Sequence, residues 1–251
     1  MTVEEFSNEF DVLYNNISSN QSPGLNEYEK SVFLTKAQNE ILKNYFNPKG
    51  NKYQEGFDGS EKRQIDFSKL IKVYSINERG SDGSITPPQT EMTPFDTRGV
   101  CYKLPNDILF IINELAVIQD GDITRIVNIV PMNYTEYSKN MSKPYKQPLK
   151  NQGWRLIHTE NTTDSIAEII VKSGSTIQKY SIRYVKKPCP IILTNLRDEY
   201  GSVSIDGESI KTECELDSIL HPEILQRAVE LAKASYTGDI NSVIAMGQRS
   251  E

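Results

Sequence analysis

Residues 25–46, LNEYEKSVFLTKAQNEILKNYF, decide the fold because they form a helical pattern with apolar residues on two sides. At about 100° per residue, one arc of this helix gathers Leu34, Ala37, Ile41 and Tyr45. A second arc gathers Tyr28, Val32, Leu42 and Phe46, and polar residues separate the two arcs. A surface helix of a lone domain needs only one apolar stripe. The second arc is therefore predicted to be buried or shared with another surface.

The residues before this helix predict a second one that runs antiparallel to it. Thr2 and Glu5 have capping-box spacing, and apolar residues follow at steps of three and four through residue 17. Residues 18–24, SSNQSPG, have the composition of a turn, and Asn26 with Glu29 repeats the capping box. The NPKG sequence at 47–50 ends the long helix.

The middle of the chain is predicted to be β-structure. Five runs rich in β-branched and aromatic residues are separated by Gly, Asp, Asn and Pro, at 99–105, 107–118, 123–131, 165–173 and 176–185, and residues 70–76 add a strand before them. Because few of these runs are separated by a helical crossover, the sheet should be mainly antiparallel. Two long excursions interrupt it, a loop at 77–94 and a short helix with a proline-broken segment at 133–154.

The C-terminal part returns to helix. An acidic linker with a predicted hairpin turn at Asp206–Gly207 leads to a helix that begins near Pro222. We therefore predict an α+β fold in which N- and C-terminal helices form one helical part and a mainly antiparallel β part is inserted. The predicted boundaries are 1–66 for the first helical part, 67–192 for the β domain, and 193–251 for the linker, last helix and C-terminal tail.

Composition favours a soluble protein with an uneven charge. The net charge of −6 divides into −4 for residues 1–66, +4 for 67–190 and −6 for 191–251. Opposite signs along one chain suggest complementary surfaces, within a chain or between copies. Ordinary scatter of charges along the sequence is the alternative explanation. No run reaches the roughly 18 apolar residues of a membrane span, and the acidic N-terminus is unlike a secretory signal. Three widely spaced cysteines predict free thiols and a cytoplasmic origin.

The sequence offers little for catalysis. Its two histidines, His158 and His221, fall on a predicted strand and at a predicted helix start, where structural roles are usual. The chain has neither a nucleophile-elbow pattern nor a phosphate-binding loop. The Asp120–Gly121–Asp122 sequence could hold a cation but is typical of a turn between strands. We predict no catalytic residue, no cofactor and no metal site.

A basic segment is more informative about binding. Between residues 138 and 159 the chain carries no acidic residue, and its bases are Lys139, Lys143, Lys146, Lys150 and Arg155. The interleaved Tyr145 and Trp154 would suit phosphate binding and base stacking. In a protein that is acidic overall, a solvated loop or a contact with an acidic protein neighbour is favoured over nucleic-acid binding. We call Lys143, Lys146, Lys150 and Arg155 the basic arm and predict that it contacts neighbours.

Several segments together resemble the head–tail connector proteins of short-tailed bacteriophages, the adaptor or tail tubular rings, and most of all the ring proteins of crAss-like phages. They occur in the family's order over about four-fifths of the chain. They are LNEYEKSVFLTKAQNEIL, FDGSEKRQIDFSKLI, YKLPNDILFIINE, KPYKQP with WRL, YSIRYVKKPCPIIL and HPEILQRAVELAKASY. The resemblance implies terminal helices, an inserted β part and a twelve-fold ring without catalysis. Residues 77–94 and the middle excursions depart most from the family pattern.

The resemblance implies a function for the protein and roles for the apolar arc and the C-terminal residues. We predict a non-enzymatic virion protein of the tail or neck, assembled in the host cytoplasm, that docks below the portal protein and presents a surface to the next tail or ring protein. Double-stranded DNA would pass through its channel during ejection without sequence-specific binding, and no membrane would be involved. The second arc (Tyr28, Val32, Leu42, Phe46) would lie between subunits. A portal-binding tail would consist of Ile240, Val243, Ile244, Met246 and Arg249.

Two alternatives belong to other functional classes. A surface- or carbohydrate-binding β module of a phage tail would place Trp154, Tyr145 and Tyr180 in one sugar-stacking cleft. A hydrolase would assemble a non-local active site, in which His158 would be the residue to test.

Overall fold

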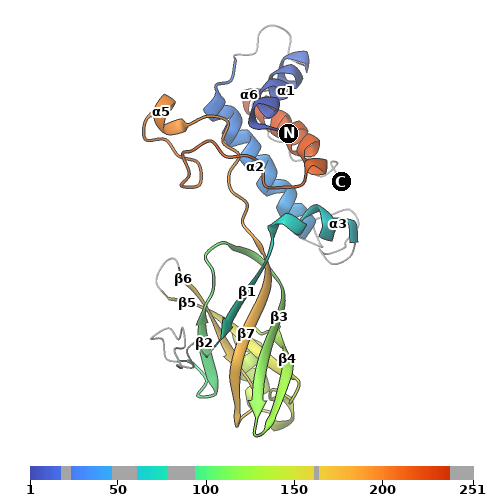
Figure 1. Cartoon of the computed structure of the whole chain (residues 1–251), viewed down its shortest axis with the longest axis vertical. Coiled ribbons are helices and arrows are strands. Elements are labelled where there is room, and N and C mark those ends of the chain that lie inside the picture. Colours follow the sequence, from blue (N-terminus) through green and yellow to red (C-terminus); the bar gives the residue numbers. More distant parts are fainter. Residues whose placement is uncertain (18–23, 47–60, 78–93, 161–163, 238–251) are drawn as a thin grey trace. The chain divides into compact units, whose positions relative to one another are not determined.

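The computed structural model describes residues 1–17, 24–46, 61–77, 94–160 and 164–237. The chain divides into two compact units (Figure 1). We call Met1–Leu70 with Pro188–Glu251 the helical unit, and Ile71–Lys187 the sheet unit. The helical unit contains α1 (Val3–Ile17), α2 (Glu27–Phe46), α3 (Glu61–Asp66), η2 (Ser68–Leu70), α5 (Leu196–Tyr200), η4 (Ser218–Leu220) and α6 (His221–Thr237). The sheet unit contains β1 (Ile71–Asn77), β2 (Gly99–Lys103), β3 (Ile108–Asp120), β4 (Ile123–Pro131), α4 (Tyr134–Met141), η3 (Pro144–Lys146), β5 (Gln152–Glu160), β6 (Asp164–Ile170) and β7 (Ser175–Lys186).

The core of the helical unit lies between α1, α2 and α6, which pack on one another. Both predicted capping boxes are confirmed. The backbone N–H of Thr2 donates to Glu5 while the N–H of Glu5 donates to Thr2, and Asn26 and Glu29 exchange the same pair of bonds. These bonds satisfy donors that the first turn of a helix otherwise leaves without a partner. The two helices therefore begin within one residue of the predicted positions.

The first arc of α2 faces α6, as its apolar pattern predicts. Leu34 and Ala37 are fully buried and Ile41 is 5% exposed. Tyr45 continues this side, since its hydroxyl lies 3.5 Å from Glu223 of α6 and its ring packs edge-on against Phe67. Burial of these apolar side chains contributes to the stability of the unit.

The sheet unit is a single seven-stranded sheet in the order β1-β7-β3-β4-β5-β6-β2. All pairs are antiparallel except β4 with β5, which run parallel because α4 and η3 lie in the connection between them. The first and last strands of the unit are neighbours, and Ile71 of β1 is paired with Val185 of β7. A large apolar cluster from β1, β2, β3, β4, β6 and β7 fills one face. The predicted α+β fold with a mainly antiparallel insert is confirmed.

The predicted turns are confirmed where the structure describes them. Gly121 lies in the β3–β4 hairpin and has a positive φ of 65°. Asp206 and Gly207 both have positive φ and are flanked by the Ile205–Glu208 bridge, as a tight hairpin turn requires. The loop at 77–94 falls almost wholly outside the described residues. Strand β5 contains His158, as predicted, although residues 152–160 lack the continuous β-branched and aromatic pattern of the five predicted runs.

Candidate assembly surfaces

The second arc of α2 is met by the chain itself. Residues 188–217, which follow β7 and which we call the strap, run beside α2. Tyr28 and Val32 pack against a cluster of the strap residues Ile192, Leu196 and Ile205. Both remain half-exposed, whereas Leu42 is only 1% exposed and the Phe46 side chain lies outside the described residues. Within one protomer the strap therefore covers the part of the second arc formed by Tyr28 and Val32. The predicted role of the arc between subunits stays a prediction.

Polar side chains between the two arcs hold the strap in register. The N–H of Leu193 donates to Ser31 Oγ at 3.0 Å, and the N–H of Ile191 donates to Thr35 Oγ1 at 3.2 Å. One step further, Gln38 donates to the carbonyl of Cys189 at 2.9 Å. Residues four positions apart on the helix are separated by about 6 Å along its axis, and every second residue of an extended chain by about 6.6 Å. Side chains about one turn apart on α2 can therefore bond to the backbone of every second strap residue. Ser31, Thr35 and Gln38 therefore form a seam that satisfies buried backbone groups.

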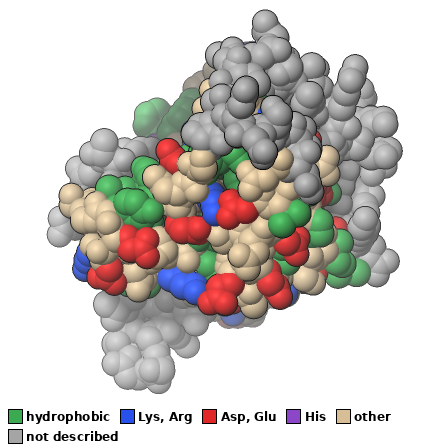
Figure 2. Space-filling view, turned by 90° about the horizontal axis from the view of Figure 1, so that it is seen from above, with side chains coloured by type: hydrophobic (Ala, Val, Ile, Leu, Met, Phe, Trp, Pro, Cys, Tyr) green, Lys and Arg blue, Asp and Glu red, His purple; other side chains and the backbone are tan. Residues whose placement is uncertain are grey.

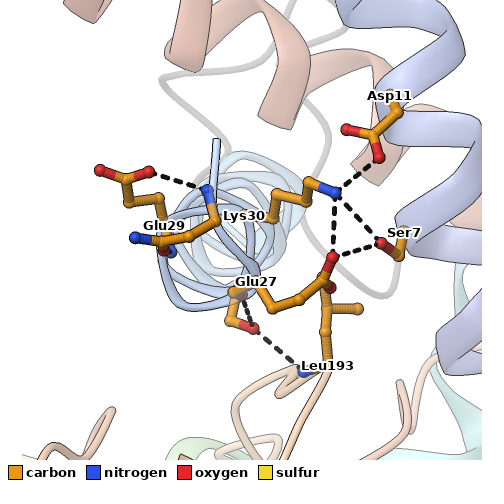
Figure 3. Close-up of polar contacts among 8 residues, drawn as sticks. Ser7, Asp11, Glu27, Glu29, Lys30 and Leu193 are labelled. Atoms are coloured by element: carbon orange, nitrogen blue, oxygen red, sulfur yellow. Dashed lines mark hydrogen bonds and ion pairs between the residues drawn. The ribbon is translucent and has the colours of Figure 1, made fainter. Parts of the chain in front are cut away.

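A buried lysine fastens α1 to the start of α2 (Figure 3). Lys30 is 3% exposed, and its Nζ lies 2.7 Å from Asp11, 3.0 Å from Glu27 and 3.2 Å from Ser7. Burial alone would lower the pKa of Lys30. The hydrogen bonds to Asp11 and Glu27 outweigh burial and raise the pKa above its ordinary value. The ammonium thus stays charged and joins two helices that the 18–24 segment connects.

The basic arm divides into two parts in the structure. Lys143, Lys146 and Lys150 are exposed on and around η3. Arg155 is 8% exposed, and its Nη1 lies 2.7 Å from Glu114, which also accepts a bond from the Tyr180 hydroxyl. Arg155 therefore belongs to the interior of the sheet unit, and the three lysines form the exposed surface. The prediction that they contact a neighbour stays a prediction.

The segment that carries the exposed lysines is held against the sheet by residues on either side of η3. Tyr137 of α4 packs with Trp154, Leu156 and Ile170, and its hydroxyl donates to Asp96 at 2.9 Å. Hydrogen bonds from Arg98 hold the pKa of Asp96 down at about 2, although burial opposes this shift. Arg98 also donates to Gln147 at 3.3 Å, immediately after η3. The arm is therefore fixed to the sheet at both α4 and Gln147.

Neither histidine lies in an open catalytic arrangement. His221 is 5% exposed at the start of α6, where it contacts the N-terminal amine of Met1 and the carbonyl of Leu216. Burial lowers the pKa of His221 below its ordinary value. His158 bridges the buried Glu168 at 2.5 Å and the Tyr134 hydroxyl at 2.8 Å. The Tyr134 hydroxyl already donates to the carbonyl of Ile157, so these contacts tie α4 to β5 and β6.

The aromatics of the carbohydrate alternative do not share a cleft. Trp154 is 4% exposed and Tyr180 is 1% exposed, and they belong to separate apolar clusters. Tyr145 is exposed on the basic arm. The residues of the predicted portal-binding tail, Ile240, Val243, Ile244, Met246 and Arg249, lie outside the described residues. None of the three cysteines, all of which the structure describes, forms a disulfide, as the sequence predicts.

Comparison with known proteins defines the class of this chain as a structural ring component of phage tails. Residues 1–243 match the family described as phage tail ring protein 3/4, and the chain belongs to that family. It is 55% identical to ring protein 4/5 of Bacteroides phage crAss001 over 251 residues, the full length of both chains. It is 31% identical to ring protein 3 of the same phage over 241 residues, which is 94% of this chain and 97% of that protein.

Membership of this family implies an oligomeric ring in the virion tail and a non-enzymatic role. The predicted resemblance to ring proteins of crAss-like phages is confirmed. Within the described residues, no helix is both long and apolar enough to cross a membrane.

Proposed function

We propose that the ring formed by this protein docks below the portal protein, prolongs the DNA channel and carries the attachment surface for the next tail or ring protein. The observation that carries this proposal is the position of α6. This helix is buried against α1 and α2 through Ile224, Leu225 and Ala228 and leads directly into residues 238–251. A tail that follows a fixed helix, with four apolar side chains, is suited to bind a partner. We take the ring to be dodecameric from the family resemblance.

The tail can supply substantial binding free energy. Burial of Ile240, Val243, Ile244 and Met246 would contribute roughly 1.5–3 kcal/mol each before the cost of ordering the segment. Arg249 adds a charge that could pair with a carboxylate of the portal. Packing of the same residues on the helical unit of their own chain is the competing explanation.

Deletion of residues 240–251 is expected to leave a folded protein that no longer attaches to portal-bearing heads. Occupancy on purified heads is measured by electron microscopy, and folding by thermal denaturation. A matched control replaces the polar tail residues Asn241, Ser242 and Gln248 by alanine, which should retain attachment. Normal occupancy of the truncated protein would place the docking surface elsewhere. A large drop in melting temperature would show that the tail packs on its own chain.

The exposed lysines are proposed to contact protein and to leave DNA free to slide. Replacement of Lys143, Lys146 and Lys150 by glutamate is expected to reduce assembly at least tenfold while the affinity for short duplex DNA stays weak and changes little. Three phosphate contacts would give a visible salt dependence of DNA binding, so fluorescence anisotropy at several salt concentrations checks the second half. Tight, salt-sensitive binding of duplex DNA by the native protein, lost in the variant, contradicts this assignment.

A further inference from the structure

One face of the sheet unit carries exposed aliphatic residues in a neutral and basic surround. Val73 of β1 is paired with Arg183 of β7. Further along β7, Ser181 and Lys179 are paired with Leu115 and Val117 of β3. Val117 is paired in turn with Ile126 of β4. The residues between them, such as Tyr180, Ala116 and Val127, point to the buried cluster on the other side. Because side chains alternate along a strand, the first set shares the outward face, which we call the outer sheet face.

This face is exposed and lacks acidic groups. Val73 is 65% exposed, Ile126 69% and Leu115 37%. Among the described residues of the four strands, the outward side chains include the bases Lys179 and Arg183 and no carboxylate. Neither base has an ion-pair partner within the described part of the chain. Exposed aliphatic residues rimmed by polar groups of one sign indicate an interaction surface.

Helix α1 carries a surface that also has exposed aliphatic residues but has the opposite charge. Glu5, Glu9 and Val12 follow one another at steps of four and three, so they share a face, and Asn8 and Leu13 flank them. Val12 is 57% exposed and Leu13 37%. The helix contains no lysine or arginine. It thus presents two aliphatic side chains among carboxylates, opposite to its buried face of Phe6, Phe10 and Tyr14.

The charges of the whole units follow the same division. The helical unit contains 13 basic and 22 acidic residues, a net charge of −9, and the sheet unit contains 15 and 12, a net charge of +3. Figure 2 shows one face of the helical unit, where acidic side chains clearly exceed lysine and arginine. An acidic patch attracts a basic patch and repels another acidic patch, so these charges favour contacts between a helical unit and a sheet unit of different copies.

We propose that α1 of one copy packs on the outer sheet face of the next copy in the ring. The contact joins two different patches, so it is head-to-tail, and a head-to-tail contact closes into a ring when its rotation allows. Val12 and Leu13 meet the aliphatic residues of the strands, while Glu5 and Glu9 lie near Lys179 and Arg183. This inference rests on the proposed ring, and it concerns the contact between neighbours, not the docking to the portal.

The test exchanges charge between the two patches. The sheet variant carries Lys179→Glu with Arg183→Glu, and the helix variant carries Asn8→Lys with Glu9→Lys; Glu5 is left in place because it caps α1. Each variant alone places like charges against each other, and each is expected to lower ring yield at least about tenfold. A matched control, Lys36→Glu with Arg197→Glu, changes two exposed bases elsewhere and should assemble normally.

Mixing the two variants is the decisive step. When the two variants alternate around a ring, the acidic α1 of the sheet variant meets the basic sheet face of the helix variant, and the basic α1 of the helix variant meets the acidic sheet face of the sheet variant. Every contact then pairs opposite charges, so the equimolar mixture is expected to form rings that neither variant forms alone. Ring yield is measured by electron microscopy of protein assembled on portal-bearing heads, with melting temperatures as the folding control. If either variant alone forms rings with unchanged yield, the proposed contact is wrong, although the protein still forms a ring. Loss in both variants without recovery on mixing also overturns it, because the faces then meet other partners.

Discussion

Replacing Ile41 by aspartate is expected to unfold the helical unit. Ile41 is 5% exposed on the arc of α2 that faces α6, so the new carboxylate would lose its hydration without gaining a partner. A buried, unpaired charge of this kind costs about 4–5 kcal/mol, which approaches the whole stability of many domains. The variant should therefore lose most of the helical signal in circular dichroism at room temperature.

The matched change on the second arc is Val32→Asp. Val32 is half-exposed against the strap, so the carboxylate keeps contact with water and the expected loss is only about 1–2 kcal/mol. If this arc lies between subunits, the protein stays folded and fails to enter rings. Equal loss of folding from both substitutions would mean that the entire circumference of α2 serves the core of its own chain.

Replacing Glu114 by alanine is expected to destabilise the sheet unit by about 3–5 kcal/mol. The change leaves the guanidinium of Arg155 buried without its carboxylate, and removes the acceptor of the Tyr180 hydroxyl. Burial, followed by the charge of Glu114, raises the pKa of Tyr180, so this hydroxyl stays protonated and requires an acceptor. Chemical denaturation followed by tryptophan fluorescence measures the effect, because the chain has a single tryptophan, Trp154, which is buried in the sheet unit.

Two further variants separate the buried pair from a general effect of lost charge. Lys72→Ala breaks an exposed ion pair with Asp107 and should cost no more than about 1 kcal/mol. The combination Glu114→Leu, Arg155→Met and Tyr180→Phe removes all three polar partners together, and it should recover most of the lost stability. Failure of the combination to recover would show that shape, and not an unpaired charge, causes the loss.

Much of the fold follows from local sequence signals. The capping boxes at Thr2 and Asn26 are encoded within four residues each, and the alternating runs of the sheet carry their own turns. The two arcs of α2 were also visible, since apolar spacing shows which sides of a helix are buried. The spacing does not show which part of the structure covers each arc. The strap, which is mostly polar and acidic, resembles a linker by composition.

The missed contacts depend on residues that only the fold brings together. Thr35 and Ile191 are 156 residues apart, and Glu114 and Arg155 are 41 apart. One signal was present, because Ser31, Thr35 and Gln38 recur at helical spacing between two apolar arcs. Polar side chains in such a position indicate a buried backbone partner. Arg155, in contrast, looked like part of a basic segment until the register of β5 placed it inside the sheet.

The pairing of Ile71 with Val185 gives the sheet unit the character of a module. Its first residue is paired with a residue close to its end, so both of its connections to the rest of the chain start from neighbouring positions of the sheet. Insertions between neighbouring positions disturb a host fold little. A lineage can therefore lengthen, shorten or exchange residues 71–187 as one block while the path of the chain through the helices stays the same. Sequence variation can accumulate in this block without redesign of the helical scaffold.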